Sequence, residues 1–159
     1  MVKITSRALG AAVVAGSLVA LPAAASASPI SAAATVALHT DRADDALARA
    51  AVQFEAGKER AALKSLNGSR AHMGKAAAAA NAMVRKSRTP AQRFAAAKAV
   101  RQVAGERHDN VVELAKMLAD AKTAAAETAI AKAALADVTG REKAIVVLQA
   151  LLELSLIHI

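Results

Sequence analysis

Four basic side chains, Arg85, Lys86, Arg88 and Arg93, fall within nine residues around Thr89-Pro90, a pair typical of a chain turn. Clustered guanidinium and ammonium groups attract repeated negative charge by non-specific electrostatics. Between Glu59 and Glu106 the sequence has no carboxylate, so nothing nearby along the chain neutralises these cations. We therefore expect an anionic-polymer binding surface at this turn, with Lys75 as a fifth contact. The alternative interpretation, a solvated face that only keeps the protein soluble, remains open.

The formal net charge of +8 is strongly segregated. Residues 58–107 carry twelve basic and two acidic residues, whereas residues 28–57 and 108–159 each have a net charge of −2. The only Phe, Tyr or Trp residues are two Phe residues, so few side chains could stack on nucleic-acid bases. No helix-turn-helix pattern occurs in the sequence. The predicted partners are an anionic cell-wall polymer or a membrane surface, without specific nucleic acid. Association of the chain with copies of itself is also expected.

The other residue types give little indication of a catalytic or metal-binding site. The chain has no cysteine, which excludes disulfides and thiolate sites. The histidines show no metal-ligand spacing, and Glu-x-x-His pairs are missing (His39, His72, His108, His158). No phosphate-binding loop, nucleophile elbow or catalytic triad order appears. We therefore predict no catalytic residue, no metal, no cofactor and no enzymatic activity in these residues.

A long helical hairpin is expected to position the basic cluster. Small and apolar residues recur every three or four positions from residue 58 to 87, in phase through Asn67-Gly68. Thr89, Pro90 and Gln92 form a capping box that starts a second helix, which keeps its phase through Gly105. Its predicted inward face runs from Phe94 to Leu118. The two helices are expected to pair as an antiparallel hairpin over residues 58–120.

Shorter helices are expected on both sides of this hairpin. One runs from Asp41 to a stop at Gly57, another covers residues 124–138 after the cap Thr123, and a capping box at Thr139-Gly140-Arg141-Glu142 opens a last one. Between residues 28 and 153 only 28 residues are large and apolar, so the core must rely on closely packed alanine helices. The predicted fold is an all-α antiparallel hairpin or bundle of about five helices, without strands, over residues 41–153.

The two ends of the sequence have their own signatures. Lys3 and Arg7 precede an apolar stretch over residues 8–21, and Ala25-Ser26-Ala27 matches a signal-peptidase site, so residues 1–27 are predicted to be a signal peptide. An uncleaved membrane anchor is the alternative. Residues 28–40 are expected to be a flexible lead-in. The last six residues, LSLIHI, resemble a translated sequencing adapter, so residues 154–159 are expected to be an artefact and the natural chain to continue beyond Glu153.

The export signal, the alanine richness and the capped helices together resemble uncharacterised exported alanine-rich proteins of high-GC Gram-positive bacteria. The resemblance lies in these general features of the whole chain and implies no functional residue. From the residues, we expect a secreted or cell-envelope protein that binds anionic envelope polymers or lipid through its basic hairpin tip, without catalysis. Two alternatives stay open: a structural, oligomerising helical scaffold, and the N-terminal accessory region of a larger protein.

Overall fold

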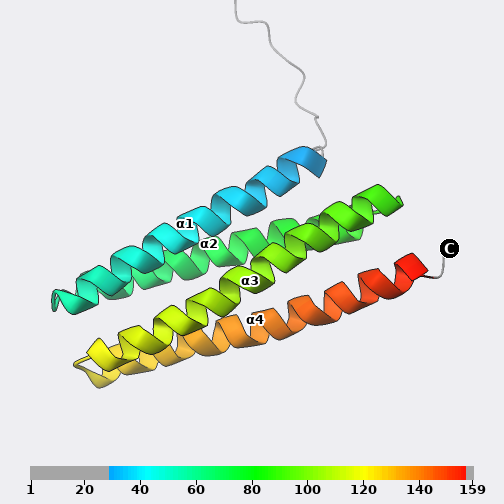
Figure 1. Cartoon of the computed structure of the whole chain (residues 1–159). Helices are drawn as coiled ribbons and strands as arrows, with labels where there is room; N and C mark the ends of the chain where they lie inside the picture. The colour runs from blue at the N-terminus through cyan, green and yellow to red at the C-terminus, as the bar shows by residue number, and fades with distance from the viewer. Residues whose placement is uncertain (1–28, 157–159) are drawn as a thin grey trace, which may run out of the picture.

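The computed structural model describes residues 29–156, with side chains over residues 31–154. It consists of four antiparallel helices joined by short turns: α1 (Pro29–Glu55), α2 (Glu59–Lys86), α3 (Pro90–Asp120) and α4 (Ala124–Leu156) (Figure 1). The all-α class is confirmed, and no strand occurs over the described residues. The expected count of five helices is wrong, because the structure has four. The predicted signal peptide and residues 157–159 lie outside the described range.

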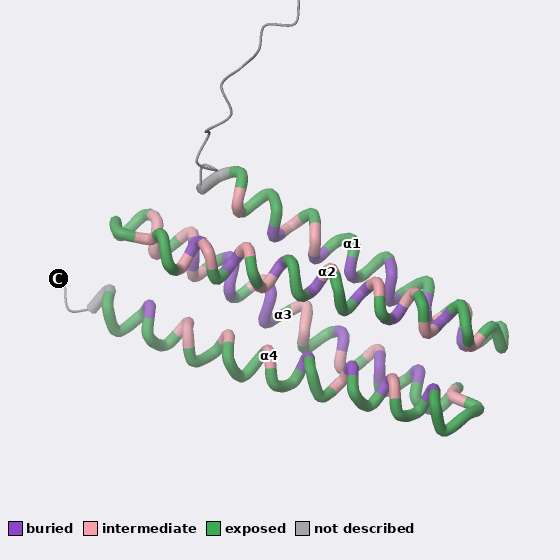
Figure 2. The backbone as a smooth tube through the Cα atoms, turned by 180° about the vertical axis from the view of Figure 1, so that it is seen from behind, coloured by how far each residue is buried: buried purple, intermediate pink, exposed green. Residues whose placement is uncertain are grey.

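The helices form two close pairs that cross each other. α1 packs most extensively on α2, and α3 on α4, while α3 also lies against α1 and α2. Figure 1 shows the α2–α3 turn at the same end of the molecule as the start of α1 and the end of α4. The buried residues follow the facing sides of these helices (Figure 2). As the sequence requires, alanine supplies about half of the buried apolar positions, and it lets the helix axes approach closely.

Two core clusters divide the molecule along its length. The first lies toward the α2–α3 turn and includes Met73, Met83, Val100 and Leu151. The second lies toward the other two turns and includes Phe54, with Leu66, Leu114 and Ile130. The first cluster reaches Met83 and Ala96, close to the turn on both helices. The turn is therefore supported by packing almost to its tip.

The prediction of a flexible lead-in over residues 28–40 is wrong, because residues 29–40 form the first turns of α1. Val36 and Thr40 are completely buried there. The Thr40 hydroxyl donates to the carbonyl oxygen of Ala37 at 2.9 Å and accepts from the side-chain amide of Gln102 on α3 at 3.0 Å. A buried threonine among alanines conceals the helical period, since neither residue type stands out in a hydrophobicity pattern.

The prediction of two helices over residues 124–153 is also wrong, because α4 passes through Thr139-Gly140 without a break. Gly140 has a packing role instead of a capping role. A Cβ atom built there would overlap the guanidinium of Arg107 on α3. That guanidinium donates to the carbonyl oxygen of Ala136 at 2.9 Å and pairs with Asp137 at 3.5 Å. Gly140 therefore makes room for a side chain that joins α3 to α4.

The inward face of α3 is rotated from the expected one. Phe94, expected to face inward, is 75% exposed, and Leu118 is 44% exposed. The buried positions of α3 include both Val103 and Ala104, and both Leu114 and Met117. This broader pattern arises because α3 packs on α1 and α2 and also on α4. The spacing of the sequence predicts a single stripe of inward-facing residues. Such a stripe is too narrow for a helix that has partners on two sides.

Candidate anion-binding surface

The α2–α3 turn is fixed by a dense set of hydrogen bonds. The backbone N–H of Gln92 donates to the Thr89 hydroxyl at 3.2 Å, and the Gln92 side-chain oxygen accepts from the N–H groups of Arg88 and Thr89 at 2.8 and 3.1 Å. This is the expected capping box, with Pro90 in the first turn of α3. The Ser87 hydroxyl donates to the carbonyl oxygen of Val84 at 2.7 Å. The basic side chains are thus attached to an ordered backbone.

Four of the five predicted contacts come together at this turn, and we call Arg85, Lys86, Arg88 and Arg93 the basic turn. The first three are exposed, whereas Arg93 is half-buried and donates to the carbonyl oxygen of Arg88 at 3.4 Å. Lys75 is not part of the group, since ten residues of α2 separate it from Arg85, a distance of about 15 Å along a helix axis. Arg85 and Lys86 also lie in the last turn of α2, where cations stabilise the helix dipole.

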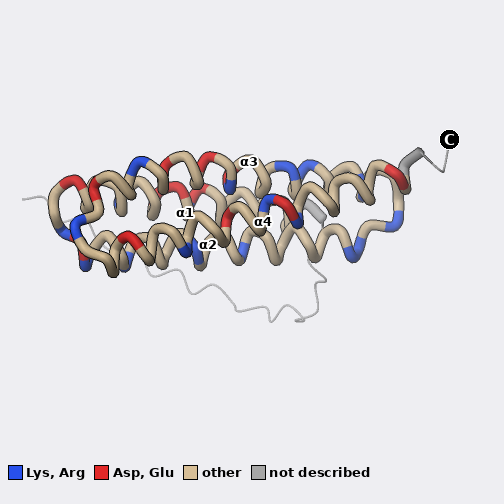
Figure 3. Tube along the Cα trace, turned by 90° about the horizontal axis from the view of Figure 1, so that it is seen from below, with Lys and Arg blue, Asp and Glu red and all other residues tan. Residues whose placement is uncertain are grey.

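The charge around the basic turn is predominantly positive. The segments that build the first core cluster (residues 32–43, 73–103 and 144–151) carry eight basic residues and one acidic residue, Asp41. Lys and Arg are seen around the end of the molecule where α2 leads into α3 (Figure 3). Within residues 31–154, the side chains of the basic turn make no ion pair. The charge of Arg85, Lys86 and Arg88 is therefore directed toward solvent, where an anionic partner is accessible, whereas Arg93 is half-buried and its Nε is buried.

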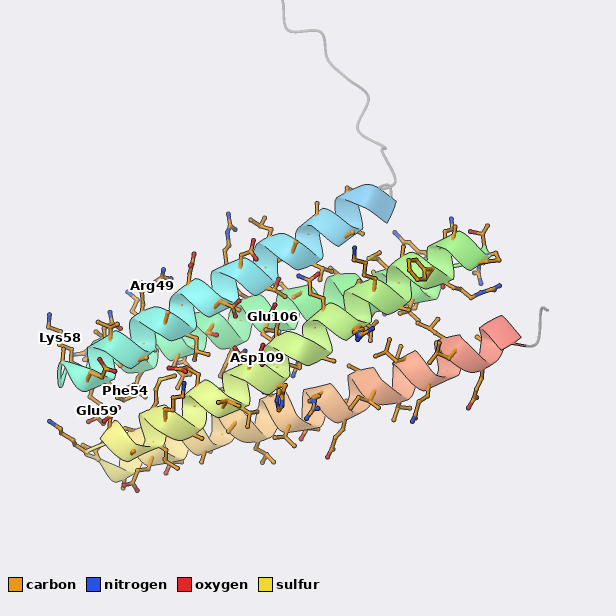
Figure 4. The ribbon with its side chains drawn as sticks, viewed as in Figure 1. Arg49, Phe54, Lys58, Glu59, Glu106 and Asp109 are labelled. Carbon is orange, nitrogen blue, oxygen red and sulfur yellow. The ribbon has the colours of Figure 1, made fainter. Side chains whose placement is uncertain are left out.

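A second group of charges, the acidic cluster, lies at the middle of the molecule between α1 and α3. It consists of Asp41 and Asp44 on α1 and Glu106 and Asp109 on α3, the last two of which are labelled in Figure 4. Burial, the charge of Asp44 and a hydrogen bond to Asp44 raise the pKa of Glu106 to about 7. Burial likewise raises the pKa of Asp44. Two carboxyl groups that share a proton satisfy one another, and we assign this cluster no ligand.

Two histidines that are far apart in the sequence meet across α1 and α2. The Nδ1 atoms of His39 and His72 are 3.1 Å apart, so one ring donates a hydrogen bond to the other. Partial burial, together with the charges of His72, Lys75 and Arg42, lowers the pKa of His39. The pair offers two nitrogen ligands next to two cations, which is a poor environment for a metal ion. No group of three or more potential metal ligands occurs among the described residues.

A buried polar contact and a small cavity lie where α2, α3 and α4 meet. The side chains of Arg107 and Asp137 are 13% and 9% exposed. Burial raises the pKa of Asp137, while Arg107, Asn110 and Arg70 oppose the shift. A cavity of about 170 Å³ beside Arg107 is lined by alanines and valines and by Asn81 and Lys143. A second cavity, of about 310 Å³, is lined by both Arg107 and Asp137. Because the two charges are paired with each other and join α3 to α4, we assign the pair a structural role.

No stretch of the described helices is both long and apolar enough to span a membrane. Comparison of the chain with models of protein families, with curated proteins and with solved structures gives no match. Any functional argument therefore rests on the surfaces of this chain itself.

Proposed function

We propose that this chain is a non-catalytic helical protein of the cell envelope that binds an anionic polymer or an anionic lipid surface through the basic turn. The observation that supports the proposal is the exposed positive charge of Arg85, Lys86 and Arg88, which form no ion pair within residues 31–154 and are held on a hydrogen-bonded turn. A rigid turn limits the entropy lost on binding, since the backbone that carries the cations is already ordered. Export is supported by the N-terminal sequence, whose basic start, apolar stretch and Ala25-Ser26-Ala27 are typical of a signal peptide.

The chemistry common to the proposed partners is a surface with repeated phosphate or carboxylate groups. Arginine, which supplies three of the four cations, binds such groups with two parallel hydrogen bonds. Sequence-specific nucleic-acid binding is not part of the proposal, because the basic turn offers no aromatic side chain for stacking apart from Phe94.

The experiment compares two variants of equal charge. The first changes the basic turn (Arg85→Gln, Lys86→Gln, Arg88→Gln and Arg93→Gln). The second makes the same number of changes at exposed residues toward the opposite end of α1 and α2 (Arg49→Gln, Lys58→Gln, Arg60→Gln and Lys64→Gln). Binding of the full chain to poly(glycerol phosphate) and to phosphatidylglycerol vesicles is measured over a range of salt concentrations. Circular dichroism confirms that both variants remain helical.

We expect the first variant to lose at least about tenfold in affinity at low salt. The slope of the logarithm of its binding constant against the logarithm of the salt concentration should become shallower by up to about 0.7 per lost phosphate contact. The control should lose much less. Equal losses in both variants would mean that net charge alone causes binding, and unchanged binding in the first would exclude the basic turn. Retention on only one of the two probes would identify whether polymer or lipid is the partner.

A further inference from the structure

Helix α4 has apolar side chains on two opposite faces. Its inner face packs on α3 through buried residues such as Ile130, Ala133 and Leu151. Its outer face carries large apolar side chains that are 40–66% exposed, and we call them the outer seam: Leu135, Val138, Ile145, Val146 and Leu152. A helix that is apolar on two sides is typical of an element with partners on both of them. Over residues 29–156, the chain provides a partner for only one of these faces.

The other helices leave the outer seam uncovered. α4 lies against α3 and to a small extent against α2, and makes no comparable contact with α1. In a closed four-helix bundle, the first and last helices would be neighbours. Here the crossing of the two helix pairs places α4 on the outside of the molecule (Figure 1), with exposed residues along its outer side (Figure 2). The seam therefore faces solvent over most of the length of α4.

The spacing of the seam is that of a helix–helix contact. Leu135, Val138, Ile145 and Leu152 follow a seven-residue repeat in which Glu142 and Gln149 occupy the two remaining positions. Such a repeat is typical of helices that pack along one another with knobs in holes. A carboxylate and an amide in the middle of the seam disfavour burial in a lipid surface, where neither group reaches water, whereas a contact between two helices leaves the ends of both side chains at its solvent edge. The geometry thus favours a second helix over a membrane.

We propose that the outer seam binds the outer seam of a second copy of this chain, with the two α4 helices antiparallel. In the register centred between residues 143 and 144, Leu135 meets Leu152 of the second copy, Val138 meets Gln149 of that copy, and Ile145 meets its Glu142. Lys132 and Glu153 flank the seam on one side. In this arrangement the Lys132 of each copy lies next to the Glu153 of the other, giving opposite charges at both ends. A parallel pair would instead place the two Glu142 side chains against each other, and like charges there are unfavourable.

An antiparallel pair has a consequence for the basic turn. The basic turn lies at the end of the molecule where α4 terminates (Figure 1). Two copies joined through antiparallel α4 helices therefore carry their basic turns at opposite ends of the assembly. This consequence, unlike the pairing itself, rests on the proposed function: such a dimer would connect two anionic surfaces or two polymer strands, and linked sites increase the apparent affinity.

The absence of cysteine from the sequence gives a direct test of the register. Three variants of the full chain are equilibrated in a glutathione redox buffer: Leu135→Cys, Leu152→Cys and the double variant with both. Seventeen residues of helix, about 26 Å, separate the two positions within one chain, too far for an internal disulfide. We expect the double variant to form a covalent dimer and the single variants to remain monomeric on a non-reducing gel. Dimers of the single variants as abundant as those of the double variant would overturn the antiparallel arrangement.

Sedimentation equilibrium tests the pairing without cross-linking. The full chain is compared with Leu135→Glu/Ile145→Glu on the outer seam. The control is Val52→Glu on α1, whose exposure of 64% is close to the 66% of Leu135. At about 0.5 M salt, where binding through the basic turn is screened, we expect a dimer whose dissociation constant rises at least about tenfold in the seam variant and is unchanged in the control. A monomeric full chain, or equal weakening by the control, would overturn the proposal. The glutamine variant of the basic turn should still dimerise, so failure of the proposed function is distinguishable from failure of the pairing.

Discussion

The shared proton of Glu106 and Asp44 makes the stability of the protein depend on pH. The side chains face each other across the α1–α3 contact, with Asp41 and Asp109 as further negative neighbours. Burial and these carboxylates raise the pKa of Glu106 from its ordinary value of 4.5 to about 7. A carboxyl whose pKa is higher in the folded chain stabilises the fold below its ordinary pKa, and this contribution is lost as the pH rises through the folded value. We therefore expect the protein to lose stability between pH 4.5 and pH 7.

Replacing Glu106 by glutamine removes the ionisation and leaves a donor for Asp44. Ionising a carboxyl of pKa about 7 at pH 8 costs at most about 3.4 kcal/mol relative to the unfolded chain. Because Glu106 is partly exposed, solvent screening reduces this figure, and we expect about 1 kcal/mol. Glu106→Gln should therefore raise the free energy of unfolding by about 1 kcal/mol at pH 8 and leave it nearly unchanged at pH 4.5.

Urea unfolding, followed by circular dichroism at several pH values, measures this difference directly. Glu113→Gln is the matched control on the same helix, because Glu113 pairs with Lys116 at 3.0 Å. Loss of this exposed pair should slightly destabilise the protein at pH 8, by about 0.3–0.5 kcal/mol. Asp44→Asn should give a gain similar to that of Glu106→Gln, and the double variant should add little. A gain from Glu106→Gln that is the same at all pH values would refute the shared proton.

Two further predictions concern the glycines and the capping box. Gly74→Ala adds a Cβ that meets no atom within 4 Å and should raise stability by about 0.5–1 kcal/mol, whereas Gly140→Ala should lower it by about 1 kcal/mol because it displaces the Arg107 guanidinium. Thermal unfolding of both variants checks this contrast, and a stabilising Gly140→Ala would contradict the close approach of Arg107. Thr89→Ala removes the acceptor for the Gln92 N–H and should cost about 1 kcal/mol. Hydrogen exchange at the Gln92 amide should then accelerate, and an unchanged rate would argue against the cap.

The parts of the fold that the sequence predicts are those with local signals. The end of α1 depends on Gly57, whose φ of +69° favours glycine, and the starts of α3 and α4 depend on Thr89 and Thr123, whose hydroxyls accept from backbone N–H groups. The continuity of α2 through Asn67-Gly68 follows from its unbroken spacing. All of these features involve residues within four positions of each other, which is the range over which sequence patterns are informative.

The features that sequence reasoning missed depend on contacts between distant segments. His39 and His72 are 33 residues apart, and Arg107 and Asp137 are 30 apart, so no local pattern connects them. The continuity of α4 was missed for a different reason, since Thr139-Gly140 has the form of a helix start. The inward positions Ala133, Asp137, Gly140 and Ala144 nevertheless keep a spacing of three and four through that point. Because aspartate and glycine are not apolar, a hydrophobicity pattern does not identify Asp137 and Gly140 as part of a buried face.

The distribution of large apolar side chains supports a partner for α4. Leaving aside Leu154, ten large apolar side chains are exposed among the described residues, and five of them lie on α4, whereas α2 has none. Exposure that is merely tolerated would be spread over the helices, because an isolated surface leucine has little consequence. The core meanwhile relies on alanine at about half of its buried apolar positions, although the chain has larger residues that are placed outside it. A sequence with so few large apolar residues, and with half of the exposed ones on a single helix, is better explained by a second surface that becomes buried in an assembly than by an inefficiently packed monomer.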